Sequence, residues 1–320
     1  MTTVSTLPEV VTVRAPAKVN LELRVGPRRR DGYHDLATVF QAVSLHDEVS
    51  VWRSDDWQVL AAGPYAELVP TAGENIAVRA ARLIAARGEV DEALTIRIDK
   101  DIPVAGGMAG GSADAAATLL ACDLLWGLDL DRDELGELAA ELGSDVPFPL
   151  QGGNLMGSGR GERLTPVLAR GSFDWVFAVS GTGLSTPEVY AEADRLRQQW
   201  RSGPPPAPRV SARLMAALRS GDAEALGAAL GNDLQEAAFA LRPELRDLCE
   251  AGIDFGALGA IVSGSGPTVA FLTASHEAAL DLSVSLSAAA LCRDIRRARG
   301  PVPGAQVVAA PRTPRSPGPG

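Results

Sequence analysis

The feature that most constrains this chain is a glycine-rich segment, residues 103–116, which reads Pro-Val-Ala-Gly-Gly-Met-Ala-Gly-Gly-Ser-Ala-Asp-Ala-Ala. An alternating apolar pattern at 94–98 precedes it and predicts a strand. A helical pattern follows it, with Ser112 as the expected N-cap. Glycine has no Cβ, so the backbone N–H groups of such a loop can approach an anion closely. The order strand, glycine loop, helix N-terminus therefore predicts a phosphate site.

A glycine-rich loop can also be an ordinary tight turn, and the chain has 33 glycines, so the loop alone leaves that alternative open. Two well-known phosphate motifs do not match it. The segment lacks the Gly-x4-Gly-Lys-[Ser/Thr] pattern of a Walker A loop, and its glycines are not spaced as Gly-x-Gly-x-x-Gly. The sequence thus argues against a P-loop NTPase and against a Rossmann fold.

The charge balance and the cysteine spacing argue against several classes of protein. The formal net charge is −10, which disfavours nucleic acid as a partner, because duplex binding depends on basic residues that neutralise phosphates. The three cysteines lie far apart, so we expect neither a zinc motif nor a disulfide framework, but reduced thiols in a cytoplasmic protein. We see no signal-peptide pattern and no apolar run of bilayer length, and therefore expect no membrane partner.

Hydrophobic periodicity predicts an α+β chain of two domains. Strand patterns and capped helical patterns are interspersed in an order that does not suit a regular βαβ sheet. The predicted strands lie at 10–25, 37–43, 47–53, 94–98, 175–179 and 268–272, and the predicted helices at 75–87, 131–142 and within 210–252. We expect a first domain at 1–165, a second at 166–310 and a disordered tail at 311–320, which is rich in Pro, Arg and Gly.

Lys18 is a candidate catalytic cation. The chain contains only two lysines, Lys18 and Lys100, against 28 arginines. Arginine replaces lysine readily on a surface, whereas a site that needs a compact ammonium group keeps lysine. The alternation of the first strand puts Lys18 and Asn20 on the same polar face. The alternative is an ordinary strand lysine in solvent.

Asp145 is a candidate general base. It lies in the segment Gly-Ser-Asp-Val-Pro-Phe, just after a predicted helix end. Pro147 predicts an extended conformation for Val146, which would fix the path of the chain at this point. A carboxylate held there can accept the proton of a substrate hydroxyl. The alternative is an Asx-turn residue.

Aromatic and imidazole side chains suggest a site for a nucleobase. The segment from Arg28 to His34 reads Arg-Arg-Arg-Asp-Gly-Tyr-His, in which Tyr33 offers a stacking face and His34 two ring nitrogens. Tyr190 follows Thr186-Pro187 and can supply a second stacking face. The alternatives are a basic surface turn and a core tyrosine.

Taken together and in order, five segments resemble the GHMP kinase superfamily. They are Ala-Pro-Ala-Lys-Val-Asn-Leu at 15–21, Asp-Gly-Tyr-His at 31–34, the loop at 103–116, Gly-Ser-Asp-Val-Pro-Phe at 143–148 and Ser-Gly-Ser-Gly at 263–266. The first two segments are typical of the branch that acts on a diphosphocytidyl methylerythritol. The resemblance covers about residues 10–310.

The resemblance implies a fold and an activity. The fold is an N-terminal domain like ribosomal protein S5 domain 2 and a ferredoxin-like C-terminal domain, with the active site in the cleft between them. The activity is ATP- and Mg²⁺-dependent phosphorylation of the 2-hydroxyl of 4-diphosphocytidyl-2-C-methyl-D-erythritol, in the non-mevalonate route to isoprenoid precursors. Small molecules, ATP and this alcohol, are the implied partners.

The resemblance also assigns site residues. Lys18 and Asp145 match the catalytic pair, and Asn20, Tyr33, His34, Thr186 and Tyr190 match substrate positions. Gly264, Ser265 and Gly266 form the second glycine element. The Mg²⁺ ligands cannot be identified from the sequence, and the hydroxyl of Ser112 is the one candidate. The nucleotide phosphates would lie against Pro103, Val104, Ala105, Gly106, Gly107, Met108, Ala109, Gly110, Gly111, Ser112 and Ala113.

Three loop residues depart from the usual pattern of this branch. Ala105 and Ala109 stand where glycine is common, and Asp114 where asparagine is common. A negative charge at 114 would face phosphate unless the side chain points away or helps to hold the metal.

Two other functions stay open. One is a kinase of the same superfamily that acts on homoserine or mevalonate. The other is an inactive nucleotide-binding protein, which the presence of both Lys18 and Asp145 disfavours.

Overall fold

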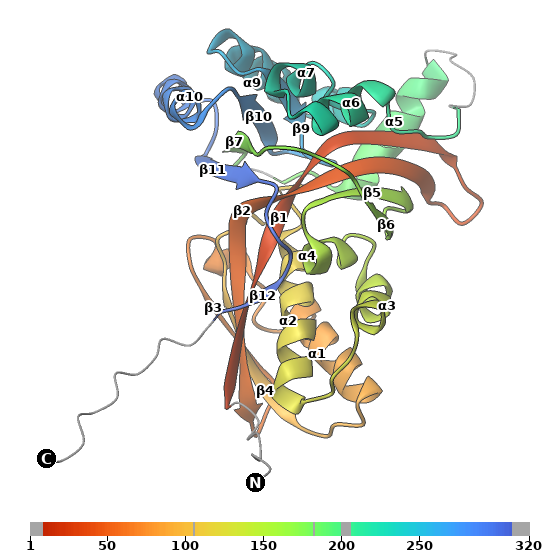
Figure 1. The fold of residues 1–320 in the computed structure, drawn as a ribbon, viewed down its shortest axis with the longest axis vertical. Helices are drawn as coiled ribbons and strands as arrows, with labels where there is room; N and C mark the ends of the chain where they lie inside the picture. Colours follow the sequence, from red (N-terminus) through yellow and green to blue (C-terminus); the bar gives the residue numbers. More distant parts are fainter. Residues whose placement is uncertain (1–8, 105, 182, 200–205, 309–320) are drawn as a thin grey trace, which may run out of the picture.

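The structure is a computed structural model that describes residues 9–104, 106–181, 183–199 and 206–308. Ala105 and the predicted tail at 311–320 lie outside the described residues. The described part forms a lower unit, with a long-stranded sheet and helices on one side, and an upper unit with a smaller sheet (Figure 1). No helix in these ranges combines the length and apolarity needed to cross a bilayer.

The lower sheet is built on two long antiparallel strands, β1 (Val10–Arg28) and β2 (His34–Ser54). The alternation that predicts β1 is explained by burial, since its apolar side chains from Val11 to Val25 lie in the core. The other strands of this sheet are β3 (Gln58–Ala62), β4 (Ala93–Asp99), β5 (Asn154–Gly159), β6 (Arg163–Pro166), β8 (Gly231–Asn232) and β12 (Gln306–Val307). Pairing is antiparallel except between β3 and β4 and between β1 and β8.

Helices cover one side of this sheet (Figure 1). They are α1 (Ile76–Arg87), α2 (Gly110–Trp126), α3 (Arg132–Leu142) and the short α4 (Pro147–Gln151), and a 3₁₀ turn, η1 (Ala66–Leu68), precedes α1. Two predicted starts are confirmed: Asn75 accepts the N–H of Ala77 at 2.8 Å, and Asp131 forms a capping box with Glu134. Between α1 and the sheet lies α2, whose many alanines allow this close packing.

The upper unit has the strand order of a ferredoxin-like fold. Its sheet runs β11-β7-β10-β9, all antiparallel, and the chain passes through it as strand, helices, strand, strand, helix, strand. The strands are β7 (Phe173–Val179), β9 (Gly259–Val262), β10 (Val269–Thr273) and β11 (Asp294–Gly300). The helices are α5 (Thr186–Gln199), α6 (Ala212–Ser220), α7 (Ala223–Gly227), α8 (Gln235–Leu241), α9 (Glu244–Asp254) and α10 (His276–Ala289). The predicted α+β class is confirmed.

The two units share their core and their backbone pairing. One hydrophobic cluster contains Val13 and Leu21 from β1 together with Trp175 and Leu214 from the second half of the chain. The strands β8 and β12 come from the second half of the chain, yet both pair with β1. The two units are therefore joined by shared side-chain packing and by backbone pairing as well as by the chain itself.

Two local predictions are wrong. The N-cap of α2 is Ala109 rather than Ser112, because Ala109 adopts φ +61° and its carbonyl already accepts the N–H of Ala113 at 2.8 Å. Val146 is helical, with φ −66° and ψ −35°, rather than extended. Its N–H donates to the carbonyl of Gly143 at 3.2 Å, and Pro147 then fits the first position of α4, where its missing N–H costs nothing.

Candidate active site

A cavity of about 850 Å³ lies where β1, the glycine loop, the α3–α4 turn and α5 meet. Its volume is within the range of small-molecule sites. Four expected residues, Val104, Ser112, Ala113 and Gly266, do not line it. The expected residues that do line it are Lys18, Asn20, Tyr33, His34, Pro103, Gly106, Gly107, Met108, Ala109, Gly110, Gly111, Asp145, Thr186, Tyr190, Gly264 and Ser265.

Lys18 is held rigidly at the base of the cavity and is not a surface lysine. Its side chain is 3% exposed, and Nζ donates to Oδ1 of Asn20. Asn20 in turn donates to Oγ1 of Thr38 at 2.9 Å. Burial lowers the pKa of Lys18 below its ordinary value, and the negative charge of Asp145 raises it in part. The alternative of an ordinary solvent-exposed strand lysine is therefore wrong.

Asp145 lies on the turn between α3 and α4. No donor in the described part of the chain binds its carboxylate, so the Asx-turn alternative does not describe it. Its charge acts on Lys18 and also on the hydroxyl of Tyr190. A carboxylate free of internal donors, near a buried ammonium and open to a cavity, is available to a substrate hydroxyl.

The glycine loop packs against the Ser263–Gly266 turn from the other half of the chain. Gly107 has φ +74°, and a Cβ on it would lie 2.0 Å from the carbonyl oxygen of Ser263. The Ser263 hydroxyl donates to the Gly107 carbonyl at 3.0 Å. The backbone N–H of Lys18 donates to the carbonyl of Met108 at 3.1 Å. These contacts fix the loop on both sides.

The first turn of α2 presents backbone donors. Its first internal bond is donated by Ala113, so the N–H groups of residues 110–112 have no helical acceptor. A Cβ on Gly111 would lie 3.7 Å from the side chain of Ile76, an ordinary van der Waals contact, and Gly110 and Gly111 both line the cavity. The arrangement suits an anion, because these donors and the helix dipole both favour negative charge.

Asp114 belongs to a buried ion cluster that the sequence did not predict. Lys100, 2% exposed, donates from Nζ to Oδ2 of Asp114 at 2.5 Å and to Oδ2 of Asp47 at 2.6 Å. Asp47 also accepts the N–H groups of Asp101 and Ile102 at 2.8 Å. Asp114 therefore points to Lys100 rather than to bound phosphate. The scarcity of lysine was the signal that could have identified Lys100.

The aromatic end of the cavity contains the expected tyrosines and an arginine that was not expected. Tyr33 is 55% exposed, and the guanidinium carbon of Arg160 lies 5.0 Å from its ring centroid. The ring of Tyr190 lies 5.1 Å from that of His34, tilted by 32°. Thr186 is bonded to Ser265 through their hydroxyls at 2.9 Å. That a nucleobase stacks between the rings of Tyr33 and Tyr190 stays a prediction.

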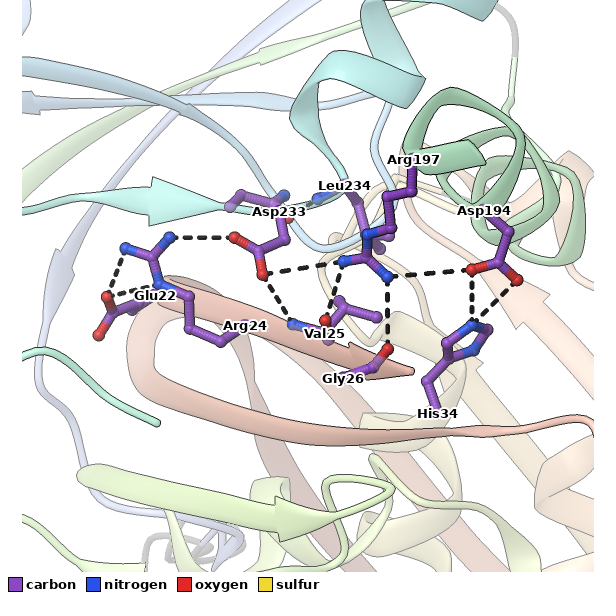
Figure 2. Close-up of polar contacts among 10 residues, drawn as sticks. Glu22, Arg24, Val25, Gly26, His34, Asp194, Arg197, Asp233 and Leu234 are labelled. Carbon is purple, nitrogen blue, oxygen red and sulfur yellow. Dashed lines mark hydrogen bonds and ion pairs between the residues drawn. The ribbon is translucent and has the colours of Figure 1, made fainter. Parts of the chain in front are cut away.

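His34 is held by residues of α5 that sequence reasoning missed. Its Nε2 lies 3.1 Å from each carboxylate oxygen of Asp194, as Figure 2 shows. Arg197, one turn further along α5, donates to the carbonyls of Val25 and Gly26 at 2.8 and 3.3 Å. Nothing local in the sequence joins Asp194 to His34, because 160 residues separate them.

The residues present fit a nucleotide better than a metal bound by the protein alone. Within the described ranges, no group of three His, Cys, Asp or Glu side chains could hold a metal ion. Mg²⁺ needs few protein ligands when phosphates and water supply the rest. The N–H groups of the glycine loop and of the first turn of α2 could supply donors for such phosphates, and Ser112 carries a hydroxyl in that turn.

Comparison with known proteins gives consistent matches. Family models described as GHMP kinases N terminal domain and GHMP kinases C terminal match residues 75–153 and 214–290. The chain is 54% identical over 304 residues to the 4-diphosphocytidyl-2-C-methyl-D-erythritol kinase of Rhodococcus jostii, covering 95% of this chain and 97% of that protein.

Solved structures agree in fold. A crystal structure of 4-(cytidine 5'-diphospho)-2C-methyl-D-erythritol kinase is similar at 34% identity and a TM-score of 0.73, covering 90% of this chain and 98% of that one. A homoserine kinase from Cytophaga hutchinsonii gives a TM-score of 0.74 at 19% identity, covering 96% of this chain and 100% of that one. That likeness concerns the fold alone, because the identity is low.

Proposed function

This chain belongs to the 4-diphosphocytidyl-2-C-methyl-D-erythritol kinase family of the GHMP kinases, and we propose that it phosphorylates the 2-hydroxyl of that diphosphocytidyl alcohol with ATP. The reaction belongs to the non-mevalonate, or methylerythritol phosphate, route to isoprenoid precursors. Because the donor is ATP, we place the enzyme in the cytoplasm. We also propose a domain boundary between residues 165 and 166.

One observation carries this proposal: a single cavity holds three kinds of groups that the reaction needs. The glycine loop supplies donors for phosphate. Lys18 supplies a cation, and Asp145 supplies a general base. Aromatic and imidazole groups for a nucleobase come from Tyr33, His34 and Tyr190. A homoserine or mevalonate kinase needs the first two kinds but has no cytidine to hold. No observation on the site favours those acceptors.

The chemistry follows from these residues. Asp145 accepts the proton of the attacking hydroxyl, while the oxygen of that hydroxyl forms a new bond to the γ-phosphorus of ATP. The bond from that phosphorus to the β–γ bridging oxygen breaks, and ADP leaves with the electron pair. Lys18, fixed by Asn20, stabilises the negative charge that gathers on the acceptor side. The N–H groups of the glycine loop and of the first turn of α2 hold the phosphates.

Magnesium completes the proposed site. When bound to the nucleotide, Mg²⁺ neutralises phosphate charge and aligns the phosphates. The Ser112 hydroxyl is the protein group that we propose would help to hold it, because Ser112 lies in the first turn of α2, although its side chain does not line the cavity in the structure. Asp114 is not proposed as a ligand, since its carboxylate is paired with Lys100.

The test is an ADP-release assay with a panel of acceptors: the diphosphocytidyl alcohol, homoserine and mevalonate. We expect acceptor-dependent ADP release with the diphosphocytidyl alcohol and none above background with the other two. The Asp145→Asn variant, which retains shape but loses basicity, is the matched control for contaminating kinases. Release with homoserine or mevalonate alone would assign the chain to another acceptor, and no release with any acceptor would support an inactive nucleotide-binding protein.

A further inference from the structure

We propose that Asp194 is a specificity-determining positioning residue: it fixes the imidazole of His34 with its proton on Nε2, so that Nδ1 is left as an acceptor for the amino group of cytosine. This inference rests on the proposed function, because it concerns the base of the same substrate. Asp194 does not touch the reacting atoms and acts only through His34.

The hydrogen bond defines which ring nitrogen carries the proton. Both oxygens of Asp194 lie 3.1 Å from Nε2 of His34, and a carboxylate has lone pairs but no proton to donate. A neutral imidazole bonded in this way therefore carries its proton on Nε2 and a lone pair on Nδ1. In the described part of the chain no donor or acceptor binds Nδ1. His34 lines the cavity, so Nδ1 is the ring nitrogen left for a ligand.

The helix α5 supplies both the bond and a packing surface for this ring. Tyr190 and Asp194 are four residues apart, and side chains at this spacing lie on the same face of a helix. The ring of Tyr190 packs against that of His34 at 5.1 Å, while Asp194 bonds its Nε2. His34 is only 6% exposed, so the ring has little freedom to turn over. Its orientation is therefore set before any substrate binds.

A network anchors α5 to the end of β1, as Figure 2 shows. Arg197 lies 3.9 Å from Asp194 and donates to the carbonyls of Val25 and Gly26. Asp233 accepts the N–H of Val25 at 2.9 Å and lies 3.9 Å from Arg197. The carboxylate of Asp194 is thus held between His34 and a guanidinium that is itself fixed to the backbone. This arrangement limits rotation of Asp194 away from His34.

An acceptor at Nδ1 distinguishes two bases of the same shape. Cytosine presents an amino donor where uracil presents a carbonyl acceptor. A lone pair on Nδ1 can accept from the amino group, but against the carbonyl of uracil it leaves two acceptors facing each other. Sites built to bond one polar group discriminate strongly against an analogue that lacks it. The Asp194–His34 pair is therefore expected to select the cytidine compound over its uridine counterpart.

The experiment combines a measurement on the free protein with kinetics. In ¹⁵N-histidine-labelled protein, nitrogen shifts separate protonated from unprotonated ring nitrogens. The chain has three histidines, and a His34→Gln sample assigns the signals of His34. We expect a proton on Nε2 and none on Nδ1 in the wild type, and loss of that preference in Asp194→Asn, whose amide can donate as well as accept.

Kinetics use the diphosphocytidyl alcohol and its uridine counterpart. The specificity ratio is kcat/KM for the cytidine substrate divided by kcat/KM for its uridine counterpart. In Asp194→Asn we expect this ratio to fall by about 10- to 100-fold, the effect of one polar contact made or lost in a closed site. The loss appears in KM for the cytidine substrate, while KM for ATP is unchanged. Asp194→Glu, which keeps the carboxylate, restores part of the ratio. Glu192→Gln is the matched control, since Glu192 lies on the same helix, pairs with Arg195 and does not line the cavity.

The outcomes separate this inference from the proposed function. If the wild type is active and Asp194→Asn has the same ratio of kcat/KM values as the wild type, the inference is overturned but the proposed function is not. The same holds if His34 of the wild type carries its proton on Nδ1 or on both nitrogens. A wild type that phosphorylates neither compound overturns the proposed function and the specificity role with it, whereas the nitrogen shifts still report the state of His34.

Discussion

Replacing Lys100 by methionine removes the cation that joins Asp47 to Asp114 beneath the glycine loop. The change keeps the length of the side chain but leaves two buried carboxyls facing each other. Asp47 would retain its two backbone donors, from Asp101 and Ile102. Asp114 would retain none in the described part of the chain, since its Oδ1 already has no partner and its Oδ2 is bonded to Lys100. Breaking a buried ion pair from one side costs about 3–5 kcal/mol of unfolding free energy.

The cost of Lys100→Met is expected to grow with pH. Burial and the neighbouring Asp114 raise the pKa of Asp47 from 3.8 to about 8, and burial raises the pKa of Asp114. Between these values the folded protein binds more protons than the unfolded chain, so the stability contributed by Asp47 is lost as pH rises from 3.8 to about 8. Lys100 lowers the pKa of both carboxyls, so its removal raises both pKa values and the loss of stability continues to higher pH. We therefore expect a cost of about 1–3 kcal/mol near pH 5, from lost hydrogen bonds, and about 3–5 kcal/mol near pH 8.

The assay is urea unfolding followed by circular dichroism near pH 5 and near pH 8. Arg97→Met is the matched control, because Arg97 is exposed on β4 and, among the residues that the structure describes, pairs with Asp99 alone, so little change is expected. Asp114→Asn in the Lys100→Met background removes one of the two carboxyls and is expected to restore part of the stability at the higher pH. A Lys100→Met cost that is equal at both pH values, or no larger than that of Arg97→Met, would refute the argument for a buried cluster.

The remaining predictions concern the three parts of the cavity. Asp145→Asn is expected to lower kcat by about 10²-fold or more with little change in KM for ATP; near-normal turnover in steady-state kinetics would remove Asp145 as the base. Gly111→Val is expected to fold, since the nearest atom to its Cβ lies 3.7 Å away, but to lose ATP binding in calorimetry because the side chain blocks the helix N-terminus; wild-type ATP affinity would contradict the phosphate site. Tyr33→Ala is expected to raise KM for the diphosphocytidyl alcohol by about 5- to 150-fold, the equivalent of one lost base stack, and Tyr33→Phe much less; loss of ATP binding instead would mean that the two pockets are reversed.

Elements whose signals are local could be predicted from the sequence. The alternation in β1 and the Asn75 cap of α1 depend on residues within a few positions of one another, and the structure has both. The strand β2 was expected as two runs but is one strand of 21 residues. A bulge opposite the step from Pro16 to Ala17 interrupts its pattern, and the pairing with β1 carries the strand across it.

Contacts between distant segments account for what the sequence did not reveal. Lys18 and Asp145 could be proposed because each lies in a segment with a recognisable pattern. Asp194 and Asp47 have no such pattern, and their roles come from partners that the fold brings to them, His34 and Lys100. The same holds for Arg160, which meets Tyr33 through a loop between β5 and β6. Tertiary packing, not local propensity, decides these positions.

Phosphorus NMR of the reaction product tests the proposed activity most directly. With ATP, Mg²⁺ and 4-diphosphocytidyl-2-C-methyl-D-erythritol, we expect one phosphomonoester to form for each ADP, with the cytidine diphosphate signals retained, and we expect this product to form at least about 10²-fold more slowly with Asp145→Asn. ADP formed without a phosphomonoester, or a phosphomonoester formed equally well on homoserine or mevalonate, would contradict the assignment of this cavity to phosphoryl transfer onto a cytidine-linked alcohol.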